Sequence, residues 1–179
     1  MWQGPSVLEA NSIELLRDRH AVNALGSVRG VFPQAPSASS TSKQPILWHV
    51  NSGKLAYFDA ENLAKLEENV AVQSADQKMR ASTLDLYFTK APDGASQINR
   101  AVGKGGVVVE EGDRRATADT GVYTAGDQKF VLSGGNPTIY DATEGTTTGR
   151  ELTFYIASDT IIVDSGSGLR TLTKHRVQR

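Results

Sequence analysis

A short phrase recurs five times along this chain and limits what it can fold into: a small or polar residue is followed three positions later, and usually again five positions later, by an apolar residue. The copies begin at Ala10, Ser52, Ala81, Ala118 and Gly149. The two apolar positions are two residues apart, which is the spacing of side chains on one face of a β-strand. Repetition over tens of residues is typical of stacked units that cannot bury their own apolar faces alone. The phrase therefore predicts strands that share a core with their neighbours.

A second phrase follows most copies and consists of an apolar residue near Gly or Asn, and then Val. It is found at residues 24–28, 66–70 and 105–107. Between a first phrase and the second we expect a turn, such as the polar residues 17–20 and 59–62. Val28, Val70 and Val107 would then lie on returning strands.

Strand-like alternation continues along most of the chain. We expect strands over residues 7–16, 21–31, 46–50, 54–58, 64–72, 79–89, 106–111, 114–124, 129–133, 138–142, 146–156, 160–164 and 169–177. Residues 9–17 also fit a short amphipathic helix, because Leu15-Leu16 breaks the strand period. The composition of residues 61–68 favours helix, but the equivalent stretches elsewhere are turn-like, so we expect a turn at residues 59–62 and the strand from residue 64 instead of a helix. The links are too short for parallel crossovers, so the sheet should be an antiparallel meander.

Composition limits the domain count and excludes several partners. The 179 residues suit a single domain over residues 1–179, with residues 33–45, rich in Pro, Ser and Ala, as a flexible inserted loop. A net charge of −1 provides no field that would attract nucleic acid. The chain has no cysteine, and hence no disulfides. No stretch of the sequence resembles a membrane span, and residues 1–10 lack the pattern of a secretory signal.

In residues 105–119 a strand, an acidic-glycine turn and an Ala-Asp strand start follow one another, and related phrases stand at residues 132–140 and 148–154. In the order and spacing of these phrases, residues 50–163 resemble the OstA-like family of periplasmic lipopolysaccharide transport proteins, which includes LptA. The resemblance implies an all-β fold, an open, twisted antiparallel β-jellyroll with two facing sheets. It also implies an interior that carries the acyl chains of lipid A, and end-to-end joining with relatives.

The parity of the phrases predicts one apolar face and one polar face. A groove formed by the apolar face would be lined by Ile13, Leu15, Leu55, Tyr57, Val70, Val72, Leu84, Leu86, Val107, Val109, Tyr123, Leu152, Phe154 and Val163. Glu14, Asp85 and Thr153 lie at the opposite parity. With only five Phe, five Tyr and two Trp in the chain, we expect a lining of Val and Leu that could stay open around an alkyl guest. A closed sandwich with an ordinary core remains an alternative.

Residue types that carry chemistry occur without the spacing that chemistry requires. His20, His49 and His175 lie in separate segments, so we expect no metal site. The loop-like residues 103–106 lack the Ser/Thr and helix of a phosphate-binding loop, and we interpret them as a turn. We interpret Arg114 and Arg115 as a solvated hairpin tip. No catalytic residues and no cofactor are expected.

The sequence and the resemblance together predict a non-enzymatic protein of the periplasm of Gram-negative bacteria. It would bind lipopolysaccharide and bridge the inner and outer membranes in outer membrane biogenesis. Its partners would be lipid A, related Lpt β-jellyroll proteins of the two membrane complexes and, in a head-to-tail oligomer, further copies of itself. Two alternatives remain open at this point: a β-solenoid or sandwich enzyme acting on polysaccharide, and a structural repeat module that binds protein.

Overall fold

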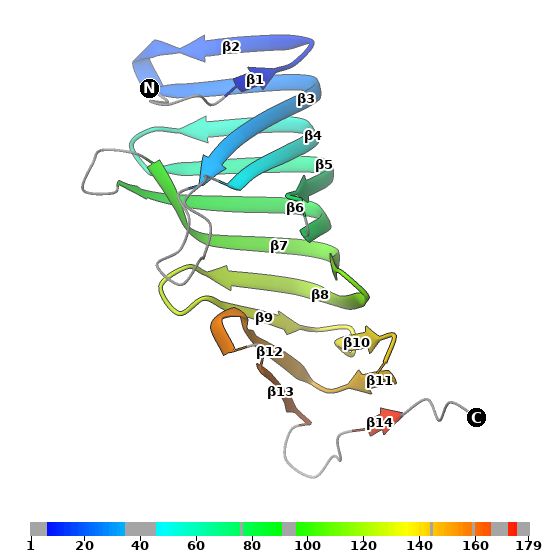
Figure 1. Ribbon diagram of the computed structural model, residues 1–179. Helices are drawn as coiled ribbons and strands as arrows, with labels where there is room; N and C mark the ends of the chain where they lie inside the picture. The colour runs from blue at the N-terminus through cyan, green and yellow to red at the C-terminus, as the bar shows by residue number, and fades with distance from the viewer. Residues whose placement is uncertain are drawn as a thin grey trace.

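The computed structural model describes residues 7–34, 46–75, 77–90, 96–143, 145–158, 160–165 and 172–174. The chain runs back and forth in antiparallel strands that stack along one axis, from β1 and β2 at one end to β13 and β14 at the other (Figure 1). The strands are β1 (Val7–Glu9), β2 (Ser12–Leu16), β3 (Ala21–Gln34), β4 (Ile46–Phe58), β5 (Leu63–Gln73), β6 (Gln77–Lys90), β7 (Ser96–Glu111), β8 (Arg114–Thr124), β9 (Lys129–Ser133), β10 (Thr138–Asp141), β11 (Gly145–Thr148), β12 (Glu151–Tyr155), β13 (Thr160–Asp164) and β14 (Leu172–Lys174). Two 3-10 turns, Arg17–Arg19 and Ile156–Ser158, are the helical segments of the described residues.

A column of β-bulges bends the long strands near their middles. On β3, β5 and β7 the register breaks where two residues oppose one residue of a neighbouring strand, at Gly26-Ser27, Glu68-Asn69 and Gly105-Gly106. All six residues have positive φ, between 48° and 79°. A bulge of this kind bends the strand and increases its twist, and Gly105-Gly106 adopts the left-handed conformation without a Cβ clash. The bulges therefore form a corner that runs the length of the stack.

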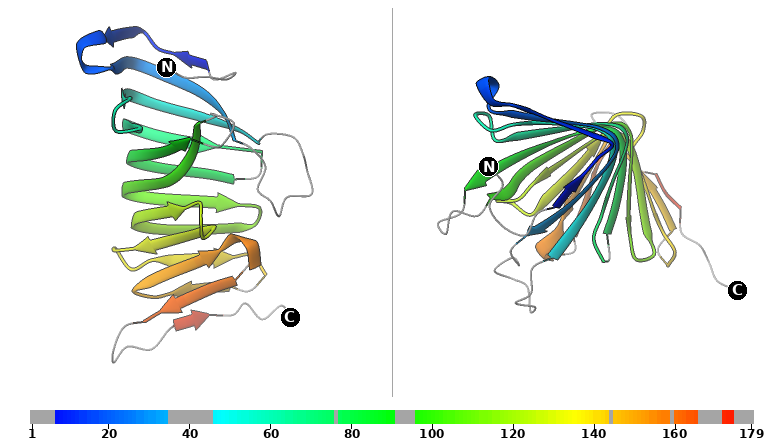
Figure 2. Two further views of the ribbon diagram at one scale, coloured as in Figure 1. Left: turned by 90° about the vertical axis from the view of Figure 1, so that its left-hand side faces the viewer. Right: turned by 90° about the horizontal axis from the view of Figure 1, so that it is seen from above.

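The corner divides the sheet into two arms. The first arm has the order β2-β3-β4-β5-β6-β7-β8-β9-β12-β13, and the second has the order β1-β3-β4-β5-β6-β7-β8-β10-β11-β14. Seen from above, the strands leave the corner in two directions and form a V (Figure 2). The sheet does not close on itself. This is the open antiparallel β-jellyroll that the sequence predicted.

The polar side of the corner is held by hydrogen bonds between neighbouring strands. Ser82 Oγ on β6 donates to the carbonyl of Gly105 on β7 at 2.7 Å. Asp119 N donates to the carbonyl of Gly134 at 3.0 Å, and Asn11 N donates to the carbonyl of Gly26 at 2.9 Å. Such bonds satisfy backbone groups that the bulges remove from the sheet ladder.

Several strand predictions are confirmed, and the errors concentrate at the corner. The strands expected at residues 114–124, 129–133 and 160–164 match β8, β9 and β13. Residues 9–17 are not helical apart from the turn that begins at Arg17, and residues 63–68 are strand as expected. The expected turns between the first and second phrases are confirmed at residues 17–20 and 59–62. Residues 103–106 were interpreted as a turn, and this is wrong: they belong to β7, because the chain bends at Gly105 and continues in the same sheet.

Several strand boundaries also differ from the prediction. Residues 7–16 divide into β1 and β2, and β7 begins at Ser96, whereas the strand was expected from residue 106. Residues 46–58 form the single strand β4, since the chain passes the corner without leaving the sheet. Residues 146–156 divide into β11 and β12, which belong to different arms and are separated at Gly149-Arg150. The loop was predicted from residue 33, but Pro33 and Gln34 still belong to β3. The rest of the predicted loop, residues 35–45, lies outside the described residues. Of the predicted strand 169–177, residues 172–174 are described as β14.

Candidate apolar groove

The inner faces of the two arms carry most of the apolar side chains. Buried residues near the β3 to β6 end form one cluster, which includes Ala24, Val50, Leu66 and Leu84. Buried residues near the β8 to β12 end form a second cluster, which includes Val107, Leu132 and Leu152. Because side chains alternate along a strand with a period of two, these apolar side chains lie between the arms and their neighbours in the sequence lie on the outer faces.

Burial decreases from the corner toward the open side of the V. Leu66 and Val107, next to the corner, are 1% and 0% exposed. Tyr57 and Val72, one step farther along their strands, are each 8% exposed. At the open side and on the edge strand β13 the apolar side chains are partly exposed; this group comprises Val22, Trp48, Met79, Phe88, Val109, Tyr123, Phe130, Phe154, Ile161 and Val163. We call these ten residues the mouth.

The structure places the predicted lining residues at three depths. Leu55, Tyr57, Val70, Val72, Leu84, Leu86, Val107 and Leu152 are buried between the arms. Val109, Tyr123, Phe154 and Val163 lie in the mouth. Ile13 and Leu15 share the inward parity on β2, but at the end of the stack they are 46% and 67% exposed. Whether any of these side chains touches a ligand stays a prediction.

The expectation of a lining poor in aromatics is wrong. Tyr57 and Phe88 pack edge to face with their ring centroids 6.3 Å apart, and the Phe130 and Phe154 rings are 6.5 Å apart. Phe88, Phe130 and Trp48 escaped the sequence analysis although each is two residues from an inward-facing residue: Leu86, Leu132 and Val50. The strand period would have identified them.

Trp48 carries a polar atom into this apolar interior. Its Nε1 is buried and has no hydrogen-bond partner among the described residues. A buried donor without a partner lowers stability by roughly 1–3 kcal/mol. The indole nitrogen is thus a group that a ligand oxygen or a water molecule would satisfy.

The family of the chain can be decided by comparison with known proteins. A family model described as "LptA/(LptD N-terminal domain) LPS transport protein" matches residues 49–160. The chain belongs to this lipopolysaccharide transport family. The match covers nearly the same residues as the resemblance noted in the sequence, residues 50–163, and confirms it.

The fold of the LptA-like family is also found by comparison of structures. The chain is similar to LptH from Pseudomonas aeruginosa, described as "the LptA homologous periplasmic component of the conserved lipopolysaccharide transport device". The TM-score is 0.58 at 15% sequence identity, and the match covers 74% of this chain and 95% of LptH. No curated protein sequence matches the chain.

One ion pair of this LptA-like domain is largely buried. Arg114 and Arg115 were expected in a solvated hairpin tip: Arg115 is 57% exposed, as expected, but Arg114 is not solvated, because its Nε lies 2.9 Å from Oδ2 of Asp141, whose side chain is only 12% exposed. Burial is the main cause that raises the pKa of the Tyr57 hydroxyl, and the nearby Asp59 carboxylate raises it further.

Among the described residues no group of three or more His, Asp or Glu side chains is arranged to hold a metal ion. None of the described helical segments is long and apolar enough to span a membrane.

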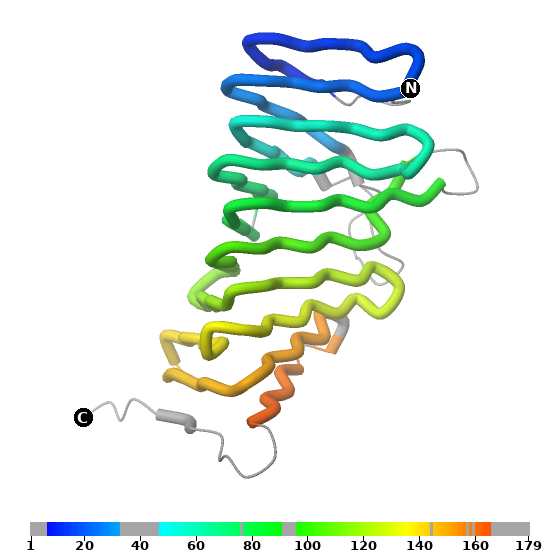
Figure 3. Tube along the Cα trace, turned by 180° about the vertical axis from the view of Figure 1, so that it is seen from behind, coloured from blue at the N-terminus to red at the C-terminus, as the bar shows by residue number. Residues whose placement is uncertain are grey.

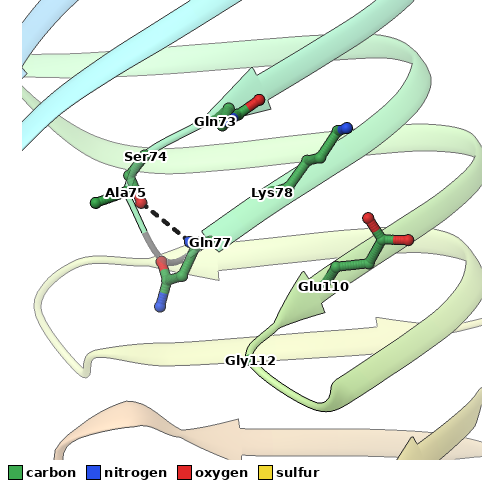
Figure 4. Close-up of a pocket in the computed structure, with 7 residues that line it drawn as sticks. All are labelled: Gln73, Ser74, Ala75, Gln77, Lys78, Glu110 and Gly112. Carbon is green, nitrogen blue, oxygen red and sulfur yellow. Dashed lines mark hydrogen bonds between the residues drawn. The ribbon is translucent and has the colours of Figure 1, made fainter.

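A shallow polar hollow lies at the tip of the second arm, away from the groove (Figure 4). Ser74 Oγ accepts a hydrogen bond from Gln77 N at 3.3 Å across the turn between β5 and β6. Lys78 and Glu110, on neighbouring strands, project to the same side. Its lining is polar and unsuited to an alkyl chain, so the apolar space between the arms is the stronger candidate site.

Proposed function

We propose that the protein binds lipopolysaccharide through the acyl chains of lipid A, which lie between the arms, and carries it through the periplasm between the inner and outer membranes. No catalytic step and no cofactor are part of this function. The proposal is supported above all by the mouth, a run of partly exposed apolar side chains from β3 to β13 along one side of the stack. The membership of the chain in a lipopolysaccharide transport family agrees with it.

The gain from burying an acyl chain is large enough to retain the lipid. Each methylene moved from water into an apolar site contributes about 0.8 kcal/mol. A chain of about a dozen carbons thus gains on the order of 10 kcal/mol before the cost of ordering it. The lipid head group, which is polar, would remain on the open side of the V.

Photocrosslinking with matched pairs of neighbouring residues tests the proposal. A photoreactive residue at Phe154 or Tyr123, which lie in the mouth, should crosslink to lipopolysaccharide in cells. The same residue at Thr153 or Val122, at the opposite parity, should not. Crosslinks of equal strength at both members of a pair would contradict a groove between the arms.

The two ends of the stack support head-to-tail assembly with relatives or with further copies. Within the described residues β2 pairs only with β3, and β13 pairs only with β12. These edges lie at opposite ends of the molecule (Figure 3), and unpaired strand edges are templates for addition of another strand. Joining them would cover Ile13 and Leu15 and extend the apolar face from one protomer into the next.

Assembly of this kind does not close, so the oligomer should lengthen as concentration rises. Sedimentation over a wide concentration range measures this. A lysine at Leu15, on the edge strand, should shift the population toward monomer, whereas a lysine at Leu47, which is 49% exposed on β4, should leave it unchanged. A monomer at every concentration would contradict the assembly and leave a solitary carrier.

A further inference from the structure

The middle of the groove is lined by unusually small residues. Where β6, β7 and β8 cross the stack, the inward positions include Ala81, Ala101, Gly103, Ala118 and Gly121, all buried. We call this segment the waist. The two clusters of buried side chains described above meet here, since Ala101 belongs to the first cluster and Ala81 and Ala118 belong to the second. The waist therefore leaves room between the arms that larger side chains occupy elsewhere.

The Met79 side chain occupies the part of this room over Gly103, whereas Phe130 and Val107 occupy the part over Gly121. Met79 extends from β6 in the second arm and packs against both clusters. It crosses to the first arm, where a Cβ on Gly103 would overlap the Met79 ε-methyl group. Val107 Cγ2 and Ala81 Cβ lie 3.4 Å and 3.5 Å from the same point. Met79 thus fills the space over Gly103.

The shape and mobility of methionine suit a replaceable filler. Its side chain is unbranched and apolar, with three rotatable bonds, and adapts readily to its surroundings. An alkyl chain is also unbranched and has a similar cross-section. A space that holds the Met79 side chain is accordingly a space that holds a segment of acyl chain. Met79 is only partly buried, so it can move toward the open side.

We infer that Met79 is a movable plug at the waist, and that an acyl chain displaces it and lies over Gly103. This inference rests on the proposed function and adds a specific subsite to it. With the plug in place the apolar interior is divided into two parts. With the plug displaced the acyl chain connects them, and the space over Gly103 limits how deep a chain can reach.

The protein contains an unusually direct probe of this site. Met1 and Met79 are the two methionines of the chain. Labelling the methionine methyl groups with carbon-13 gives two NMR signals, and a Met79→Leu variant identifies which one belongs to Met79. Lipid A should shift or broaden the Met79 signal. Lipopolysaccharide stripped of its acyl chains, which keeps its sugars and phosphates, should leave the signal unchanged.

The outcomes separate the inference from the function on which it rests. Crosslinking at Phe154 together with an unchanged Met79 signal would overturn the plug while leaving the groove intact. Absence of crosslinking at Phe154 would overturn the proposed function, and the plug with it. A Met79 signal that responds equally to the stripped lipopolysaccharide would also overturn the plug, because no acyl chain would then be needed.

Two substitutions on opposite sides of the contact should change affinity in opposite directions. Gly103→Ala narrows the waist and should weaken lipid A binding by roughly tenfold, the effect of about one methylene group in a tight apolar site. Met79→Ala removes the plug and should strengthen binding. Gly126→Ala is the matched control, since no heavy atom lies within 4 Å of its added Cβ.

The fold should tolerate Gly103→Ala, because the added atom meets the end of a flexible side chain. If this variant fails to fold, the double variant Gly103→Ala with Met79→Ala removes the overlap and should restore folding. Weaker binding by Met79→Ala, with its thermal midpoint unchanged, would contradict the plug. So would wild-type affinity in a folded Gly103→Ala variant.

Discussion

Arg114 and Asp141 face each other on β8 and β10 at the inner edge of the second arm, with Arg114 Nε 2.9 Å from Asp141 Oδ2. The other carboxylate oxygen, Oδ1, accepts hydrogen bonds from Thr143 N at 2.8 Å and from Thr143 Oγ1 at 2.6 Å. Asp141 therefore ties the strand pair to the turn that follows β10. The Asp141 side chain lies inward beside the buried Ile139, so the loss of its partners would leave a buried charge unpaired.

Replacing Asp141 with Ala should lower the free energy of unfolding by about 2 kcal/mol, since it removes several hydrogen bonds to one buried carboxylate. Chemical denaturation measures the change. Arg150→Ala is the control, because the Arg150 and Asp164 side chains are 70% and 51% exposed. Solvent screens such a pair, and the control should change stability by no more than about 0.5 kcal/mol. Equal effects would contradict the role given to Asp141.

The stability of the protein should fall at alkaline pH through Tyr57. Burial and the Asp59 carboxylate raise the pKa of the Tyr57 hydroxyl above its ordinary value of 10.0. The unfolded chain therefore loses this proton first, and the contribution of Tyr57 is complete below about pH 10 and is lost as pH rises through the folded-state pKa. Denaturation at neutral and alkaline pH should show a smaller alkaline loss in Tyr57→Phe than in the wild type. An identical loss in both proteins would contradict this assignment.

The corner should be sensitive to a side chain at Gly105. Gly105 has a φ of +79°, and an added Cβ would lie 2.6 Å from Ser82 Oγ. Gly105→Ala should destabilise the protein by about 2 kcal/mol through backbone strain alone, and the clash adds to it. Thermal and chemical denaturation check this against Gly126→Ala, whose turn position has free space for the new methyl group. A stable Gly105→Ala variant would show that the bend does not depend on this bulge.

The segment between β3 and β4 should be dispensable. Gln34 and Ile46 are paired across the two strands, so the hairpin ends are already held together by the sheet. Replacing residues 35–45 with a short Gly-Ser loop should move the thermal midpoint by only a few degrees, since closing a flexible loop depends weakly on its length. Loss of the folded state on replacement would show that this segment packs against the domain.

Sequence reasoning found the apolar face but not its depth. Leu84, Leu86, Leu152 and Phe154 were placed on one face, and the structure has all four between the arms. The same reasoning could not tell that Leu152 is fully buried while Phe154 is partly exposed. The distance of a side chain from the corner decides this, and that distance depends on where the strand bends.

The sequence by itself determined which side chains share a face, because the side chains of a strand alternate with a period of two wherever the strand lies. It also contains Gly105-Gly106, which accept positive φ, but from the sequence these residues were interpreted as a turn. Only the tertiary structure decided that the chain bends there and remains in the same sheet, so that two arms face each other. It alone brought Met79 of one arm over Gly103 of the other, because contacts between the arms depend on how all the strands stack and twist together.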